Sequence, residues 1–308
     1  MGVWVDTDMG FDDLVAILVL QHAGLQIDGV SLVFGNASLE RVKANAAGLA
    51  AALGWHFPIH AGRDRSVLGR MDTAADILGI TGLPSAGRAL PEAAAELPHD
   101  AFAALCRWLE GPGPHRLLAL GPLGNIAALA LARPDLAARI DEFVWMGGGV
   151  TTGNHTASAE FNAAMDPEAV AIVLAHGLPL KMVDLDACRR NVFVPADVGP
   201  LRAAGGPNAE LLADLFAADV DIGVRRGRPG HSLYDPVAAM ALAHPELIQF
   251  RPARIDMELA GSLTRGRTVI DTRPGSQPNA SYAAELDAPA VRDVITGAIR
   301  AAAARSRP

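Results

Sequence analysis

The stretch VWVDTDMGFDD, residues 3–13, contains the features that determine the fold. Val3 to Val5 is typical of a short buried strand, and an acidic turn follows it directly. Asp12 and Asp13 then open a predicted helix, where acidic side chains complement the helix dipole. The apolar side chains that come next are spaced for one helix face: Leu14, Ile17 and Leu18. The stretch therefore predicts a strand, a polar turn and a helix.

The same order of strand, turn and helix recurs along the chain. Further strands are predicted at 30–34, 116–120, 143–146 and 180–185, and helices at 39–53 and 123–131. This alternation predicts one α/β domain over residues 1–308, with an open, mostly parallel, Rossmann-like sheet flanked by helices on both faces. Residues 62–98 and 225–232 are rich in Gly, Pro and Arg, which is typical of mobile lids and of plain connecting loops alike.

Composition excludes several classes of protein. The chain has 308 residues, half of them hydrophobic, and a net charge of −8, which disfavours binding to nucleic acid through phosphate contacts. No apolar run approaches the roughly 18 residues of a membrane span, and no signal peptide is predicted. Cys106 and Cys188 lie in apolar or amphipathic segments, as buried free thiols do. These features fit a location in the reducing cytoplasm.

Four aspartates crowd the turn after the first strand: Asp6, Asp8, Asp12 and Asp13. Carboxylates that share a site repel one another unless a cation compensates them, and hard oxygen ligands favour Ca²⁺ or Mg²⁺ over zinc. The calcium loop of an EF-hand is excluded, because Phe11 stands where its Gly is needed and Ile17 where its Glu is needed. The alternative is a helix cap with solvated charges. A metal-bound carboxylate cluster can lower the pKa of water and orient it for attack.

The run Asp6 to Asp13 resembles the opening motif of the inosine–uridine nucleoside hydrolase family. The resemblance continues in order along the chain, over residues 3–290, through these blocks: Gly35-Asn36, Leu120 to Asn125, Met146 to Gly148, Gly153-Asn154, Ala159 to Asn162 and Tyr234 to Pro236. It implies the open α/β sheet predicted above and hydrolysis of the N-glycosidic bond of ribonucleosides.

The resemblance also implies a calcium site. Asp8, Asp13 and Asp235 would bind Ca²⁺ through their carboxylates, and Gly124 through its backbone carbonyl, at a position where family members commonly have Thr. Asp8 would accept the proton of the attacking water. Asp6 would shape the cluster from behind.

A ribose site follows from the same resemblance. Its residues would be Asp12, Asn36, Asn162 and Asp235 at the 2′- and 3′-hydroxyls, Asn154 and Glu160 at the 5′-hydroxyl, and Met146 and Phe161 in the same blocks. For single residues a structural role is the alternative: helix caps for Glu160 and Asn162, a turn for Asn36, and core packing for Phe161. Nearby carboxylates would stabilise an oxocarbenium-like transition state.

The chain departs from the family where the base would leave. Tyr234 stands where many members have His, and Leu78-Gly79 aligns with a His-Gly pair. Purine-preferring relatives use aromatic residues around the base, so Tyr234 favours a purine preference. His231 is a candidate acid, although a histidine in such a loop is usually exposed. The identity of the acid is therefore open.

Two other functions compete with nucleoside hydrolysis. A haloacid-dehalogenase-like phosphatase also begins with a strand and Asp-x-Asp, but Gly10 stands where that family needs Thr or Val. A non-catalytic nucleoside-binding protein on the same scaffold would explain the missing histidines. The expected ligand is a small ribonucleoside, without nucleic acid or membrane partners, and the resemblance implies a homodimer or homotetramer.

Overall fold

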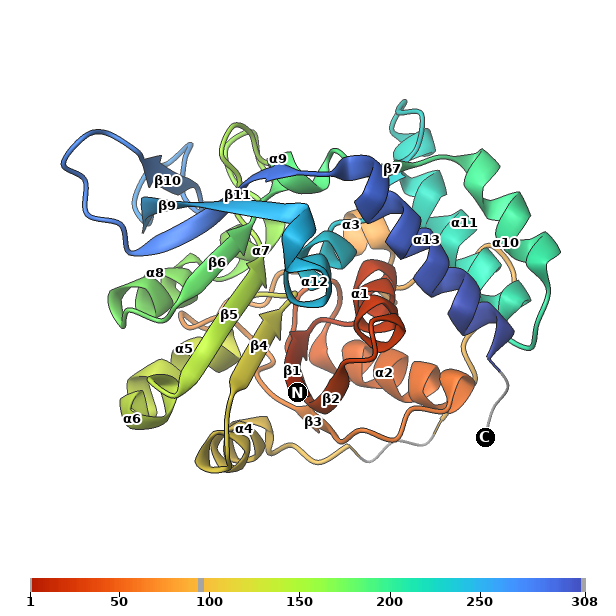
Figure 1. Cartoon of the computed structure of the whole chain (residues 1–308), viewed down its shortest axis with the longest axis horizontal. Coiled ribbons are helices and arrows are strands. Elements are labelled where there is room, and N and C mark those ends of the chain that lie inside the picture. The colour runs from red at the N-terminus through yellow and green to blue at the C-terminus, as the bar shows by residue number, and fades with distance from the viewer. Residues whose placement is uncertain (1, 94–96, 306–308) are drawn as a thin grey trace.

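A central sheet runs through this computed structural model, which describes residues 2–93 and 97–305 (Figure 1). Its strands are β1 (Gly2–Thr7), β2 (Gln26–Leu32), β3 (Ile59–Ala61), β4 (His115–Ala119), β5 (Ile140–Met146), β6 (Leu180–Val183), β9 (Ile248–Met257), β10 (Thr268–Asp271) and β11 (Ala280–Leu286). Their order is β10-β9-β11-β6-β5-β4-β1-β2-β3. Only the pairs that involve β9 are antiparallel. The predicted open, mostly parallel sheet is confirmed.

Later strands of the chain add to the sheet on both sides of β1. β2 and β3 extend from one edge of β1, and β4, β5 and β6 extend from the other, all in parallel. Such a reversal of strand order separates the loops after β1 and β4, and ligands bind in the crevice that results. The topology therefore places a site beside the acidic turn that follows β1.

Helices cover both faces of the sheet (Figure 1). One core joins the sheet to α1 (Phe11–His22), α2 (Leu39–Leu53), α9 (Leu185–Cys188), α10 (Val198–Ala204), α11 (Ala209–Arg225), α12 (Asp235–Ala243) and α13 (Ala288–Ala304). The other core joins it to α4 (Ala101–Glu110), α5 (Gly124–Ala132), α6 (Pro134–Ala137) and α8 (Pro167–Ala175). Within β1, Val3 and Val5 belong to the first core and Trp4 to the second, because successive side chains in a strand point to opposite faces.

Short elements lie around the ends of the strands. They are α3 (Ala75–Leu78), α7 (Phe161–Met165), the 3-10 turns Pro195–Asp197 and Pro245–Leu247, and a two-stranded sheet of β7 (Val192–Phe193) and β8 (His231–Ser232). Among the described residues no helix combines the length and the apolar character needed to cross a membrane. Cys106 and Cys188 are buried free thiols, as predicted.

The predicted elements agree with the structure except at ends and edges. The helix predicted at 39–53 is α2, with the same bounds. The strand predicted to end at 185 stops at Val183, because Asp184 accepts a 2.8 Å hydrogen bond from the Asp186 amide and caps α9. The predicted loop 62–98 contains only α3 among its described residues, and residues 94–96 lie outside them.

Candidate active site

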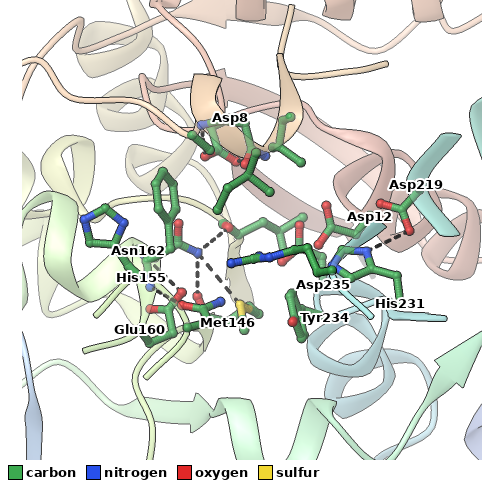
Figure 2. A pocket seen from close by; sticks show the side chains of 18 of the residues that line it. Asp8, Asp12, Met146, His155, Glu160, Asn162, Asp219, His231, Tyr234 and Asp235 are labelled. Carbon is green, nitrogen blue, oxygen red and sulfur yellow. Dashed lines mark hydrogen bonds and ion pairs between the residues drawn. The ribbon is translucent and has the colours of Figure 1, made fainter. Parts of the chain in front are cut away.

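Residues that follow β1, β4 and β5 line an open cavity (Figure 2). Its lining includes most of the predicted site residues: Asp8, Asp12, Asn36, Met146, Asn154, Glu160, Phe161, Asn162, His231, Tyr234 and Asp235. Asp13 is buried next to this lining. The structure therefore brings together blocks that lie more than two hundred residues apart in the sequence.

The turn between β1 and α1 is backbone under strain. Met9 is buried and has a φ of +42°, a conformation that residues other than glycine rarely adopt. The Thr7 hydroxyl accepts a 3.0 Å hydrogen bond from the Met9 amide, and the Asn45 side chain donates to the Met9 carbonyl at 3.2 Å. Strained turns of this kind persist only where the surroundings hold them, typically at functional sites.

Asn36 ties two of the carboxylates together. Its backbone amide donates to Asp8 at 2.7 Å, and its side-chain amide donates to Asp8 at 3.0 Å and to Asp13 at 3.2 Å. Asp13 also accepts from the Gly10 amide at 2.7 Å and from the Thr7 hydroxyl. Asn36 is therefore occupied with positioning Asp8 and Asp13, and only its amide oxygen is left for a ligand.

The carboxylates form a cluster that suits a cation. Oxygen atoms of Asp12, Asp13 and Asp235 lie within 4.8 Å of one another. Burial and the neighbouring carboxylates raise the pKa of Asp12 to about 7 and the pKa of Asp235 well above its usual value. The charge of His231 offsets part of this rise at Asp12. Carboxylate oxygen donors crowded in this way fit Ca²⁺ or Mg²⁺.

Asp6 lies behind the cluster, as expected. Its carboxylate accepts from the Ser31 hydroxyl at 3.1 Å and from the Asn125 side chain at 2.9 Å. It is buried and does not line the cavity. Burial raises the pKa of Asp6 to about 7. Asp6 therefore supports β1 and its neighbours and has no direct route to a ligand.

Glu160 and Asn162 are held rigidly on one side of the cavity (Figure 2). The Glu160 carboxylate caps α7, because it accepts from the amides of Asn162 at 2.8 Å and of Ala163 at 2.9 Å. The Asn162 side chain donates to the carbonyls of Leu120 at 2.8 Å and Met146 at 3.1 Å. The helix-cap interpretation and the cavity-lining interpretation of Glu160 therefore both hold.

Asn154 and Phe161 complete this side. The Asn154 side-chain oxygen accepts a 2.9 Å hydrogen bond from the Phe161 amide. The Phe161 ring meets the His155 ring edge-on, with centroids 5.6 Å apart. All three residues line the cavity, so Phe161 packs as a wall of the cavity and also against the small core of Val33 and Phe34.

His231 and Tyr234 lie on the other side of the cavity (Figure 2). The expectation of an exposed His231 is wrong: its side chain is 13% exposed and its Nδ1 lies 3.1 Å from the Asp219 carboxylate. The reason is β8, which pairs His231 with Phe193 and holds it against the body of the protein. Burial raises the pKa of Tyr234 to about 12, so its hydroxyl keeps its proton at neutral pH.

Gly124, like Asp13, is not among the residues that line the cavity, and the expectation that its carbonyl binds the ion stays a prediction. It is the first residue of α5, and a Cβ there would lie 3.1 Å from the Arg63 side chain and 3.2 Å from Asp166. Leu120, at the end of β4, does line the cavity. Carbonyls within a helix point along its axis, whereas the residue that ends a strand can turn its carbonyl towards the crevice.

Several cavity residues were not predicted from the sequence: Ala74, Ile77, Leu120, His155, Asp219, Arg226 and Arg228. Leu78, aligned with the missing His-Gly pair, lines the cavity beside Ile77. The sequence could have indicated His155 as a site residue, because it follows the predicted site residue Asn154 directly. No feature of the sequence indicated Asp219, because it lies in the middle of α11 among other acidic and apolar residues.

The fold and the site together define a nucleoside hydrolase. The sequence model of the inosine-uridine preferring nucleoside hydrolase family matches residues 3–293, and the chain belongs to that family. The chain is therefore an enzyme that hydrolyses the N-glycosidic bond of ribonucleosides. The phosphatase alternative loses its basis, since it leaves the blocks at 146–162 and 234–236 unexplained, and both line the cavity.

Individual relatives differ in the base named for them. The pyrimidine-specific ribonucleoside hydrolase RihB of Escherichia coli (strain SE11) is 30% identical over 269 residues, which are 87% of this chain and 86% of that protein. A purine-preferring ribonucleoside hydrolase from Gardnerella vaginalis superposes with a TM-score of 0.90 at 23% identity, over 98% of this chain and 99% of that one. A plant nucleoside hydrolase gives 0.89 at 24% identity, over 97% and 99%. At these identities the structures establish the fold.

Proposed function

We propose that this chain is a Ca²⁺-dependent ribonucleoside hydrolase that prefers purine nucleosides. The observation that carries the proposal is the cluster of Asp12, Asp13 and Asp235, whose carboxylate oxygens lie within 4.8 Å of one another beside the cavity. Ca²⁺ takes about 6–8 oxygen ligands in irregular geometry, whereas Mg²⁺ demands a near-ideal octahedron. A crowded set of carboxylates from two distant segments favours the more permissive ion.

The ion would be held by Asp13 and Asp235 of this cluster and by Asp8, whose carboxylate accepts from the same Asn36 side chain as Asp13. A backbone carbonyl after β4 would complete the set, either that of Gly124, as the resemblance implies, or that of Leu120, which lines the cavity. Leu120 already accepts one hydrogen bond from Asn162, and a carbonyl oxygen has a second lone pair to offer. When bound, the ion supplies positive charge that lowers the pKa of a water molecule and orients it. The hydrogen bonds from Asn36 keep the Asp8 and Asp13 carboxylates in place for this purpose.

Asp8 would accept the proton of the attacking water, because its carboxylate lines the cavity. The 2′- and 3′-hydroxyls of ribose would be held by Asp12, Asp235 and the amide oxygens of Asn36 and Asn162. Each Asn is fixed by hydrogen bonds from its own amide group, so its oxygen direction is set before a ligand arrives. A site that pairs every hydroxyl would reject deoxyribose strongly, because buried partners would be left unpaired.

The 5′-hydroxyl would meet Asn154 and Glu160 on the side of α7. As the C1′–N bond breaks, positive charge develops on the ribose ring, and acidic side chains fixed around it stabilise that charge. Glu160 has a rigid position because three backbone amides donate to it, from Gly148, Asn162 and Ala163. The site would then require no rearrangement of these carboxylates during the reaction.

The base would lie among Ile77, Leu78, Tyr234 and His231, which all line the cavity. A purine has more apolar ring surface than a pyrimidine, and its burial against Ile77 and Leu78 adds about 25 cal/mol for each Å² removed from water. An aromatic ring such as Tyr234 adds a favourable ring contact. These features support the purine preference.

A reducing-sugar assay on a panel of ribonucleosides and 2′-deoxyribonucleosides tests the proposal. Purine ribonucleosides should be cleaved fastest, deoxyribonucleosides about 10²-fold or more slowly, and a chelator should abolish turnover until Ca²⁺ is restored. Asp8→Asn should lower kcat by about 10²-fold or more. The matched control is Asp64→Asn, in an exposed carboxylate that pairs with Arg65.

Several results would contradict the proposal. Binding of nucleosides without turnover of any member would instead identify a non-catalytic binding protein. Unchanged activity after exhaustive chelation would remove the metal from the mechanism. Faster cleavage of uridine and cytidine than of inosine would reverse the base preference and leave the hydrolase activity standing.

A further inference from the structure

A histidine–aspartate pair lies in the cavity on the side away from Glu160 (Figure 2). The Nδ1 atom of His231 is 3.1 Å from an Oδ2 atom of Asp219. Asp219 is 5% exposed and sits in the middle of α11. Neither residue belongs to the carboxylate cluster that would hold the ion. The pair therefore needs a role of its own.

Two glycines let the strand that carries His231 approach the helix that carries Asp219. Gly223 follows Asp219 by four residues and so lies on the same face of α11. A Cβ at Gly223 would lie 1.9 Å from the Gly230 carbonyl oxygen, and a Cβ at Gly230 would lie 1.9 Å from the Phe193 carbonyl oxygen. Any side chain at either position would separate β8 from its neighbours. The packing thus fixes the position of His231 over Asp219.

The orientation of the imidazole follows from its partners. Nδ1 faces Asp219, and the Tyr234 ring packs against the imidazole edge-on, with centroids 5.7 Å apart and planes at 75°. Within residues 2–93 and 97–305, Nε2 forms no hydrogen bond with the protein. Since His231 lines the cavity, Nε2 is the ring nitrogen available to a ligand.

The charges that face His231 come from several elements. Burial lowers the pKa of His231, but Asp219 on α11 and Asp12 on α1 raise it, Arg228 in the preceding loop lowers it, and the balance is a raised pKa. Tyr234 is a phenol, which is ordinarily a much weaker acid than an imidazolium. His155 lies against Phe161, on the ribose side. On the side of the cavity where the base would lie, His231 is thus the side chain whose ordinary pKa is near neutral pH.

We infer that His231 donates a proton through Nε2 to the departing base, and that Asp219 is the positioning residue that holds His231 for this step. The inference rests on the proposed function. The C1′–N bond breaks and its electron pair goes to the base, which takes the proton from Nε2. The water oxygen bonds to C1′ while its proton goes to Asp8. Asp8 then releases its proton to solvent and His231 takes one up from solvent, so both groups return to their starting states and one water is consumed in each turnover.

The test compares two substrates whose leaving groups differ in their need for a proton. Inosine requires relief of the charge on its base, whereas the nitrophenolate of 4-nitrophenyl β-D-ribofuranoside leaves without a proton. The variants are His231→Gln and Asp219→Asn. Asp221→Asn is the matched control, because Asp221 is exposed on the same helix and forms an ion pair with Arg225, at 3.0 Å. Circular dichroism and Ca²⁺ titration confirm that each variant is folded and binds the ion.

His231→Gln should lower kcat/KM for inosine by about 10²–10⁴-fold, and Asp219→Asn by at least about tenfold, while both change the nitrophenyl riboside by less than about threefold. Asp221→Asn should change neither substrate. Equal losses on both substrates would assign the pair a purely structural role and overturn the inference, as would full activity of either variant on inosine. A wild-type protein that cleaves neither substrate would overturn the proposed function itself.

Discussion

At the level of single residues, Gly35 determines where the Asp8 carboxylate can lie. A Cβ at position 35 would be 2.0 Å from the Asp8 Oδ2 atom, so Gly35→Ala forces that side chain to move. The hydrogen bonds from Asn36 to Asp8 would then be lost or lengthened. We expect kcat/KM for inosine to fall by about 10²-fold or more, because misplaced catalytic groups are costly, and Ca²⁺ affinity to fall with it.

The matched control is Gly199→Ala on α10, where a Cβ would meet no atom within 4 Å. Steady-state kinetics and isothermal titration with Ca²⁺ measure both variants. Gly199→Ala should leave both quantities unchanged, with a small gain in stability from helix propensity. Wild-type kinetics in Gly35→Ala would show that Asp8 has more freedom than its contacts suggest.

Single residues also show what the sequence can predict about the site. Asp8, Asp12 and Asp13 could be predicted as site residues from the sequence, because they are neighbours in one turn and their crowding is evident without a structure. Asp219 could not be predicted as a site residue, because the neighbouring sequence does not distinguish an aspartate that faces a cavity from one that faces solvent two residues later. Gly124 could be proposed as a ligand only through the resemblance, because a backbone carbonyl has a direction that no residue type records.

At the level of elements, Asp166 connects the loop after β3 to helix α8. Its carboxylate accepts from the Val67 amide at 3.0 Å and from the Ala169 amide at 3.3 Å, and so caps α8. The same loop carries Ile77 and Leu78 into the cavity. Asp166→Ala should lower the free energy of unfolding by about 1–3 kcal/mol through the lost cap and hydrogen bonds. It should also raise KM more than it lowers kcat.

Asp72→Ala is the comparison for this element, because Asp72 lies in the same loop, is exposed and bonds only to the Thr73 amide. Chemical denaturation and steady-state kinetics on inosine give the two quantities for each variant. Equal effects of Asp166→Ala and Asp72→Ala would mean that the loop is held by other contacts.

Elements also differ in how well their sequences reveal them. Helix α2 was predicted to the residue because apolar positions repeat along one face and Gly54 ends it in a left-handed conformation, with a φ of +67°. β9, β10 and β11 were missed because they form an edge of the sheet. Their burial alternates irregularly, as in Ile248–Met257, so no apolar run marks them. Buried parallel strands such as β4 and β5 show continuous apolar runs.

For the whole molecule, we expect the carboxylates around the proposed Ca²⁺ site to make stability depend on pH and on Ca²⁺ together. Burial raises the folded-state pKa of Asp6 and Asp12 to about 7, against an ordinary value of 3.8, and raises that of Asp8 and Asp235 as well. A group with a raised folded-state pKa stabilises the fold below its unfolded pKa and loses that contribution as pH rises through the folded pKa. Metal-free protein should therefore lose stability between about pH 4 and 7.

Calcium should reverse this trend, because it binds the deprotonated carboxylates and only in the folded state. Each carboxylate that remains protonated in the metal-free fold contributes a slope of about 1.4 kcal/mol per pH unit. We expect Ca²⁺ to raise Tm strongly near pH 8 and weakly near pH 5, and to release protons when it binds at intermediate pH. Scanning calorimetry with Ca²⁺ and with a chelator, between pH 5 and pH 8, measures the Tm values, and titration calorimetry in buffers of different ionisation enthalpy measures the protons released. A Tm at pH 8 that is the same with and without Ca²⁺ would mean that groups of the protein itself compensate the charge of these carboxylates. The physical argument for a bound ion would then fail.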